Sequence, residues 1–246
     1  MTKQTVLVGG WHSVAAVLNS PREVFDVYIR RGRSDNRSAQ ILELAKTRGI
    51  KIQEVDDGEL AKMLPDVNHQ GCIASVASMA ALTEPDLEDL LSTAIDPLFL
   101  ILDQVQDPHN LGACLRSAAA AGASAVILPK DRSAALTPAA RKVAAGAAEV
   151  VPVIRITNLS RCIKTMQQYG VWVVGTAADA DATIHSVDLR GPMALVLGGE
   201  AGGLRRLTAE NCDVLASIPM TGAVESLNVS VAAGVCLFEA VRQRNL

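Results

Sequence analysis

Aromatic residues are scarce in this chain of 246 residues, because only 3% are Phe, Trp or Tyr. Such a composition does not favour a surface on which single-stranded bases stack against exposed rings. The apolar runs are no longer than a β-strand, so no membrane-spanning helix is expected. The first residues lack the apolar segment of a signal peptide. These absences together predict a cytoplasmic protein.

Paired cysteines and metal-ligand spacings are also missing. The chain holds four histidines and no Cys-x-x-Cys, so no metal site is expected. Its five cysteines are odd in number and irregularly spaced, which favours buried, reduced thiols. They are Cys72, Cys114, Cys162, Cys212 and Cys236.

The net charge of −3 conceals a segregated distribution. Residues 1–51 hold nine Lys or Arg against four Asp or Glu, a balance of +5. Residues 52–107 hold one against twelve, and residues 108–246 hold thirteen against ten. An acidic middle therefore separates two basic ends, and a local basic face matters more for RNA binding than the total charge.

Residues 1–76 predict a small α/β domain, with helices at 11–18 and 38–48 and strands at 24–29, 50–55 and 72–76. Four arginines follow the strand predicted at 24–29. Such a run is usually a solvated loop, and its functional alternative is contact with the phosphate groups of a nucleic acid. The predicted RNA-binding residues are Arg30, Arg31, Arg33 and Arg37.

Residues 77–96 interrupt the periodic pattern and are acidic, so they are expected to be a linker with a short helix at 86–94. From residue 97 to 246, apolar strands alternate with helices, which predicts a parallel sheet covered on both faces. Strands are expected at 98–102, 125–128, 150–154, 171–175, 193–197 and 214–218. Helices are expected near 111–121, 137–147, 158–168, 204–210 and 227–243.

Three segments within 97–246 combine a strand, a polar or glycine-rich loop and a helix start. Residues 103–118 contain Asn-Leu-Gly-Ala-x-x-Arg-Ser-Ala, residues 195–204 contain a Gly-Gly-Glu loop, and residues 218–232 contain Ser-Leu-Asn-Val-Ser-Val-Ala. In this order they resemble the three motifs of the SpoU (TrmH) branch of the SPOUT superfamily. The resemblance extends over nearly the whole chain.

This resemblance implies an N-terminal RNA-binding domain similar to ribosomal protein L30e, a C-terminal domain with a trefoil knot, and a homodimer. The implied activity is 2′-O-methylation of a ribose, of a guanosine in large-subunit (23S) ribosomal RNA, with S-adenosylmethionine as the methyl donor and no metal. Trp11-His12 and His69-Gln70-Gly71 resemble motifs of the N-terminal domain and are interpreted as packing and turn positions.

The resemblance also implies which residues form the site. Its catalytic residues are Asn110, Arg116, Glu200, Ser226 and Asn228. Its cofactor-binding residues are Gly198, Gly199, Ile218, Met220 and Leu227, where glycine lets the backbone approach a ligand closely.

The residues themselves suggest local roles. Ser226 stands where a helix N-cap belongs, Asn110 could cap the helix that follows Pro108, and Asn228 is out of place as a poor helix former. The apolar residues Leu227, Val231, Val235 and Phe238 recur at helical spacing and predict one apolar face.

Arg116 lies in a helix of small and apolar residues, where a guanidinium suits a phosphate or a developing oxyanion. Arginine is effectively always protonated, which makes it a poor general base.

Three other functions fit part of the pattern. Methyltransferases for transfer RNA share the three motifs, and a catalytically silent RNA-binding paralogue could keep the fold. A nucleotide-dependent oxidoreductase would need a Gly-x-Gly-x-x-Gly after a strand, which is absent after every predicted strand.

Overall fold

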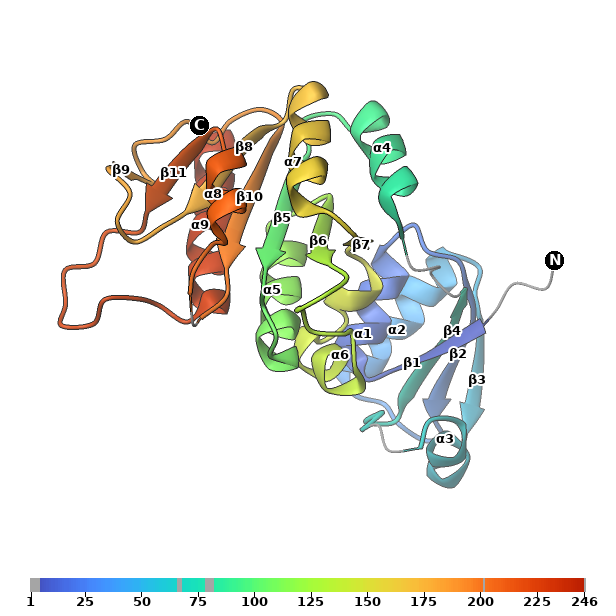
Figure 1. Cartoon of the computed structure of the whole chain (residues 1–246). Helices are drawn as coiled ribbons and strands as arrows, with labels where there is room; N and C mark the ends of the chain where they lie inside the picture. The colour runs from blue at the N-terminus through green and yellow to red at the C-terminus, as the bar shows by residue number, and fades with distance from the viewer. Residues whose placement is uncertain (1–4, 66–67, 78–81, 201, 246) are drawn as a thin grey trace. The chain divides into compact units, whose positions relative to one another are not determined.

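The computed structural model describes residues 5–65, 68–77, 82–200 and 202–245. The chain divides into two compact units, and its elements are shown in Figure 1. Unit 1 comprises Met1–Ala80 with Ala145–Val150, and unit 2 comprises Ala81–Ala144 with Val151–Leu246. Residues 78–81 of the predicted linker lie outside the described residues.

Unit 1 is built on a mixed sheet of four strands in the order β1-β4-β2-β3. Strand β4 runs antiparallel to both β1 and β2, whereas β2 and β3 are parallel. The strands are β1 (Thr5–Gly9), β2 (Val24–Arg30), β3 (Lys51–Val55) and β4 (Cys72–Ala77).

Helices α1 (Trp11–Asn19) and α2 (Asn36–Thr47) pack against this sheet through buried residues such as Val17, Ile41 and Val27. Each fully buried side chain of this size contributes about 1.5–3 kcal/mol of transfer free energy. The short helix α3 (Asp57–Met63) and strand β1 were not predicted. The start of α3 carries a detectable signal, because Asp56 and Glu59 form a capping box.

Unit 2 contains a seven-stranded sheet in which every neighbouring pair is parallel, in the order β7-β6-β5-β10-β8-β11-β9. Two-residue β9 was not predicted, and the others correspond to predicted strands. They are β5 (Leu98–Asp103), β6 (Ala125–Pro129), β7 (Val153–Ile156), β8 (Trp172–Thr176), β9 (Ala182–Thr183), β10 (Met193–Gly198) and β11 (Val214–Ser217).

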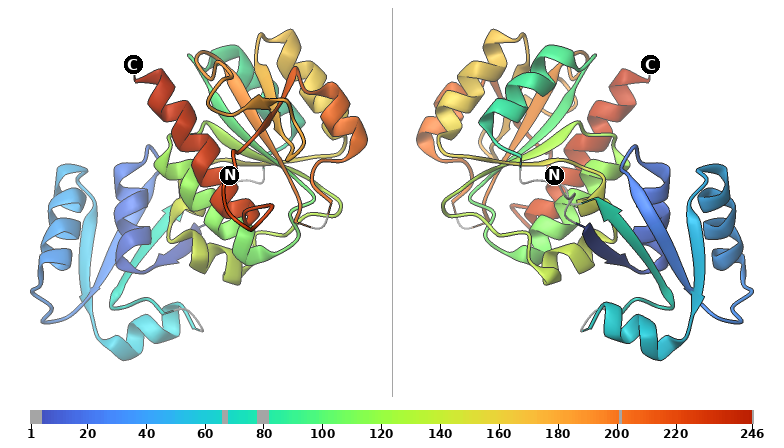
Figure 2. Two further views of the ribbon diagram at one scale, coloured as in Figure 1. Left: turned by 90° about the vertical axis from the view of Figure 1, so that its left-hand side faces the viewer. Right: turned by 90° about the vertical axis from the view of Figure 1, so that its right-hand side faces the viewer.

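Helices cover both faces of this sheet, as the two views in Figure 2 show. Phe99 and Ile101 of β5 point to one face and meet α4 (Glu84–Thr93) and α7 (Leu159–Gln168) in one buried cluster. Side chains alternate along a strand, so the equally buried Leu100 and Leu102 point to the other face. The helices of that face are α5 (Pro108–Ala120), α6 (Pro138–Ala144) and α9 (Val229–Arg244).

This architecture confirms the predicted α/β class with a parallel sheet covered on both faces. Its element order also confirms the alternation of strands and helices after residue 97. The trefoil knot stays a prediction. Among the described helices, none combines the length and the apolar character needed to cross a bilayer.

Several predicted boundaries differ from the structure by two or three residues, and two of them have a clear physical cause. The helix predicted at 137–147 stops at Ala144, because Ala145 (φ 50°) and Gly146 (φ 92°) adopt left-handed conformations. A Cβ at Gly146 would lie 2.5 Å from the Cα of Ser13, so only glycine fits there. The strand predicted at 150–154 begins later, at Val153, after Pro152, which lacks a backbone donor.

Candidate active site

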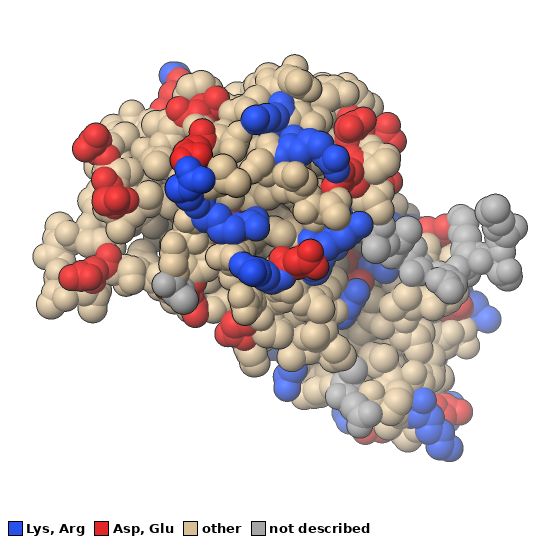
Figure 3. Space-filling model, in the orientation of Figure 1, with Lys and Arg blue, Asp and Glu red and all other residues tan. Residues whose placement is uncertain are grey.

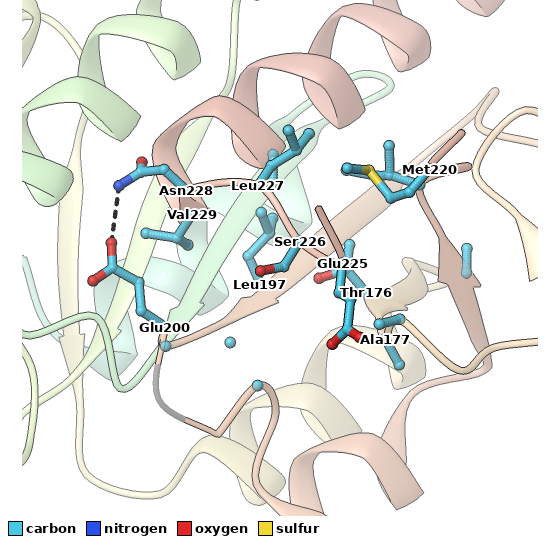
Figure 4. Close-up of a pocket in the computed structure, with 17 residues that line it drawn as sticks. Thr176, Ala177, Leu197, Glu200, Met220, Glu225, Ser226, Leu227, Asn228 and Val229 are labelled. Carbon is cyan, nitrogen blue, oxygen red and sulfur yellow. Dashed lines mark hydrogen bonds between the residues drawn. The ribbon is translucent and has the colours of Figure 1, made fainter. Parts of the chain in front are cut away.

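A pocket of about 530 Å³ opens at the carboxyl edge of the parallel sheet of unit 2. This is the edge at which open α/β sheets bind ligands. The segments that end β8, β10 and β11 form its floor and walls, and the segment preceding α9 closes it (Figure 4). Its apolar walls include Leu197, Ile218 and Leu227, and polar groups come from Glu200, Ser226 and Asn228.

At one end of the pocket, three polar side chains from distant parts of the chain share hydrogen bonds. Asn110 Nδ2 and Asn228 Nδ2 both donate to Glu200 Oε1, at 2.5 and 2.9 Å. Asn228 Nδ2 also donates to Asn110 Oδ1 at 3.1 Å. Figure 4 shows Glu200 and Asn228 facing each other across this end. Segments separated by as many as 118 positions therefore converge on one carboxylate.

The predicted helix caps at this site were wrong. Asn228, not Ser226, caps α9, because its Oδ1 accepts from Ser230 N at 2.8 Å. The cap explains why a poor helix former stands at this position. Asp107 caps α5 by accepting from His109 N at 2.9 Å. Asn110 lies inside the first turn of α5 and is 9% exposed, so its amide is directed into the polar cluster.

The loop after β10 is folded tightly against itself. A Cβ at Gly198 would lie only 2.0 Å from the carbonyl carbon of Gly203, and Gly203 N donates to Gly199 O at 2.9 Å. The far end of the loop is held by Asp103, which is fully buried at the end of β5. Its carboxylate accepts from Arg205 Nε at 2.7 Å and from Arg205 N at 3.1 Å. The helix α8 (Arg206–Asn211) starts at the next residue.

Arg116 does not join the polar cluster of its own chain. It lies six residues beyond Asn110 on α5, which turns it by about 120° and advances it by about 9 Å along the helix. Its side chain is exposed and makes no hydrogen bond or ion pair with any residue that the structure describes. Helix α5 lies beside α9, where a Cβ at Gly234 would lie 3.6 Å from Ser117 Oγ (Figure 2).

All five residues predicted to bind the cofactor line the pocket: Gly198, Gly199, Ile218, Met220 and Leu227. The predicted catalytic residues Glu200, Ser226 and Asn228 line it as well, and Asn110 reaches it through Glu200. Sequence reasoning missed Glu225 and the segment Thr176-Ala177-Ala178 after β8. The predicted strand at 171–175 indicated that this segment lies at the carboxyl end of a strand. The sequence did not give the strand order that places this end at the pocket.

The four predicted RNA-binding arginines lie in unit 1, at the end of β2 and at the start of α2, and they differ in their surroundings. Arg33 is bonded to Asp35 and to the carbonyl of Gln70, and its side chain is 23% exposed. Arg37 is exposed and makes no polar interaction with any described residue. Arg30 and Arg31 lie 4.0 and 3.7 Å from the carboxylates of Asp57 and Asp56.

Basic side chains are not confined to unit 1. Figure 3 shows Lys and Arg spread over the face of unit 2 that carries α7 and α8, with acidic side chains among them. Exposed members include Lys164 on α7, which has no acidic partner among the described residues, and Arg206 on α8, which pairs with Glu210.

The cysteines are free, and four of the five are buried, which confirms the predicted reduced thiols. Burial raises the pKa of each thiol to about 12, so all five are protonated at neutral pH. Within the described residues, no group of three or more His, Cys, Asp or Glu is arranged to hold a metal ion.

Two family models match the chain, one in each of its parts. Residues 97–238 match the SpoU rRNA methylase family. Residues 7–80 match the model of the RNA 2′-O ribose methyltransferase substrate-binding domain.

Similar proteins extend over nearly the whole chain. It is 54% identical over 237 residues to the 23S rRNA (guanosine-2′-O-)-methyltransferase RlmB of Haemophilus influenzae, covering 96% of both chains. Identity to RlmB of Photorhabdus laumondii is 52% over 240 residues, covering 97% of this chain and 98% of the relative. The crystal structure of the SpoU methyltransferase AviRb from Streptomyces viridochromogenes with AdoMet superposes with a TM-score of 0.73. It is 26% identical, over 97% of this chain and 90% of that one.

Proposed function

The chain belongs to the SpoU rRNA methylase family, and we propose that it transfers a methyl group from S-adenosylmethionine to a guanosine 2′-hydroxyl of 23S ribosomal RNA. The observation that carries this proposal is the junction of all three sequence motifs at one pocket, where Asn110, Glu200 and Asn228 share hydrogen bonds. A ribosomal RNA substrate is consistent with the cytoplasmic location expected from the sequence.

The pocket fits a nucleoside-containing donor. Ile218 and Leu227 offer apolar surface for an adenine. Because Gly198 and Gly199 carry no side chains, the polar backbone groups of this loop can approach the donor closely. S-adenosylmethionine supplies an electrophilic methyl group together with its own leaving group, a neutral thioether. The protein therefore has to position the acceptor oxygen and accommodate its proton.

The polar cluster supports a positioning role. The carboxylate of Glu200 is held by two amide donors, which fixes the orientation of Asn110 and Asn228 at the pocket's edge. Ser226 lies in the same wall and presents its hydroxyl to the pocket (Figure 4). Side chains held in this way can orient a ribose without reorganising during the reaction.

Arg116 is the proposed electrostatic stabiliser of the 2′-oxygen as it becomes an alkoxide. Its guanidinium stays protonated, so the hydroxyl proton leaves through a phosphate oxygen or water while the arginine offsets the developing charge. Because Arg116 points away from the cluster of its own chain, we propose that it serves the pocket of a second subunit.

A homodimer provides this arrangement. The predicted apolar stripe on α9 is only partly covered in the single chain, since Val231 and Phe238 are 51% and 50% exposed. The helix is buried instead through other residues, including Ala233 and Leu237. An open apolar face on α9, beside the helix that carries Arg116, is suited to a two-fold contact between identical chains.

We propose that residues 1–76 form an N-terminal domain that also binds the RNA, through Arg30, Arg31, Arg33 and Arg37. The match to a substrate-binding family model supports this role. Residues 77–96 are proposed as the linker and residues 97–246 as the methyltransferase domain. Phosphate contacts of this kind supply affinity that falls as salt rises.

The test uses the full-length protein with labelled S-adenosylmethionine and unmodified 23S ribosomal RNA. A 2′-O-methyl group blocks alkaline cleavage at its own phosphodiester, so one alkali-resistant position is expected. Replacing Asn228 by Ala should slow methylation about 10- to 100-fold, since hydrogen bonds to a carboxylate are lost. Asn245→Ala, at the exposed end of α9, is the matched control and should behave as the parent.

Two outcomes would contradict the proposal. A resistant position in transfer RNA and none in 23S RNA would move the protein to the transfer-RNA enzymes. No methylation of either RNA would identify a silent RNA-binding paralogue.

A further inference from the structure

A second pocket, of about 460 Å³, lies entirely within unit 1 and brings together the two motifs interpreted from sequence as packing and turn positions. Trp11 lines it from α1, and His69-Gln70-Gly71 lines it from the turn before β4. Arg30, Arg33 and Arg37 complete its basic side. These motifs and the arginines therefore form one site.

The turn at the base of this pocket is held in a conformation that is uncommon for its residues. Gln70 has φ 54° and Gly71 has φ 85°, so two consecutive residues are left-handed. Such a conformation is unfavourable in a non-glycine residue and needs support from its surroundings. The support converges on one atom, because Trp11 Nε1 and Arg33 Nη1 both donate to Gln70 O, at 2.9 and 2.8 Å.

The planar guanidinium of Arg33 is held in one orientation in the pocket wall. Its guanidinium lies 4.7 Å from the centre of the Trp11 ring, and Asp35 accepts from its Nε at 2.8 Å. Trp11 lies against one face of the guanidinium, Asp35 and Gln70 O hold its edge, and Arg33 still lines the pocket with its side chain 23% exposed. Unpaired RNA bases stack on arginine planes of this kind.

Apart from the carboxylate of Asp57, the remaining lining groups suit the other parts of a nucleotide. Arg37 has no polar partner among the described residues, and Arg30 lies 4.0 Å from Asp57, too far for a hydrogen bond, so both arginines keep donors for a phosphate. His69 Nδ1 accepts from Gly71 N at 3.1 Å, which leaves an N–H donor at Nε2 of the neutral ring. The exposed Asn68 adds an amide N–H donor beside it, while its Oδ1 accepts from Gln70 N at 3.3 Å.

We propose that this pocket binds one unpaired nucleotide of the RNA substrate. Its base stacks on the guanidinium of Arg33, its edge is met by Asn68 and His69, and its phosphate is met by Arg30 and Arg37. The inference rests on the proposed function only in taking RNA as the substrate. It separates Arg31, which does not line the pocket, from the three arginines that do.

The experiment measures binding of the full-length protein to two fluorescein-labelled RNAs, an unstructured 12-nucleotide strand and a blunt duplex of the same length. The strand should bind more tightly. Arg33→Lys keeps the charge but removes the stacking plane, and should weaken strand binding about tenfold with little effect on the duplex. Arg37→Ala should weaken strand binding and lower its salt slope by about one phosphate contact.

Lys46→Ala is the matched control, because it removes the same charge from the exposed surface of α2, the helix that carries Arg37, outside the pocket. Its strand affinity should stay within about twofold of the parent. Equal losses in Lys46→Ala and Arg37→Ala, with an unchanged Arg33→Lys, would overturn the pocket in favour of a diffuse basic surface. Inorganic phosphate that competes equally with the strand in parent and Arg33→Lys would overturn base stacking in favour of an anion site.

Two further measurements keep the test decisive. Thermal unfolding and calorimetric S-adenosylmethionine binding show whether each variant is folded. If Arg33→Lys is unfolded, Arg37→Ala alone carries the test, since the exposed Arg37 side chain makes no polar interaction with any described residue and is removable without disturbing the turn. A loss of about threefold in strand affinity is then expected, and an unchanged affinity overturns the proposal. A parent that binds the strand but does not methylate 23S RNA would refute the proposed function and leave the pocket standing.

Discussion

The tight conformation of the loop after β10 depends on glycine at particular positions. Gly198 has no room for a side chain, whereas nothing lies within 4 Å of a Cβ built at Gly202. Gly198→Ala should therefore force the backbone apart from Gly203 and Leu204 and weaken S-adenosylmethionine binding at least about tenfold. Calorimetric titration of the folded variants measures this directly.

Gly202→Ala is the matched control for that prediction. It introduces the same methyl group into the same loop, at a position without steric contact, and donor affinity should stay near the parental value. Equal affinities for Gly198→Ala and the parent would remove this loop from the donor site.

At the residue scale, the sequence selected side chains that line the pocket, but it assigned the helix caps to the wrong residues. Ser226 and Asn228 were both selected, but the cap was assigned to the wrong one of the pair. Either residue type can cap a helix, so composition alone does not separate them. The choice depends on the path of the loop before α9, which is fixed by long-range bonds from Asn228 to Asn110 and Glu200.

A buried carboxylate, that of Glu239, makes several polar contacts near the carboxyl end of helix α9. Glu239 is 7% exposed and accepts from Arg242 Nη2 at 2.7 Å and from Gln243 Nε2 at 2.8 Å, and His185 Nδ1 lies 3.4 Å away. The hydrogen bond from Arg242 is the main cause that lowers the pKa of the Glu239 carboxyl from 4.5 to about 2. Gln243 in turn holds the segment before β10 by accepting from Leu189 N.

This shift predicts an acid-dependent part of the stability of α9. The unfolded chain binds more protons at Glu239 than the folded chain between pH 4.5 and about 2, so stability rises with pH across that range. The contribution is complete above pH 4.5 and is lost as the pH falls towards 2. Its size is on the order of 1 kcal/mol, because the partner guanidinium is half exposed and screened.

Denaturant unfolding of Glu239→Gln at several pH values tests this expectation. The variant should be less stable than the parent at pH 7, and the difference should shrink below pH 4.5. Glu210→Gln, which breaks the exposed pair with Arg206 on α8, should change stability little at any pH. A deficit for Glu239→Gln that is the same at pH 7 and pH 3 would contradict the role of its ionisation.

At the scale of elements, hydrophobic periodicity predicted the long strands and helices. It did not predict a helix end that is set by the left-handed conformation of single residues. The stretch 139–145 has high helix propensity, yet the helix ends at Ala144 because Ala145 and Gly146 become left-handed. Gly146 is a residue type that often follows a helix end, but its close approach to Ser13 lies more than a hundred residues away in sequence. Local sequence carries no signal of that contact.

At the scale of the molecule, the two predicted catalytic residues of α5 lie in different surroundings. Asn110 is directed inward to Glu200, whereas Arg116 on the same helix is exposed and makes no hydrogen bond or ion pair with any described residue. Sequence spacing alone showed that both residues lie on one helix. It did not show that Arg116 stays apart from the polar cluster of its own chain.

Subunit mixing tests whether Arg116 acts across a dimer. One variant carries Arg116→Ala and the other Asn228→Ala, and each alone should have little activity. If the arginine serves the partner's pocket, a mixed dimer has one intact site and one doubly damaged site. Random exchange makes about half of the dimers mixed, so roughly a quarter of the parental activity should return. If the arginine serves its own chain, every site keeps one lesion and no activity returns, so silence after verified subunit exchange would reject the shared site.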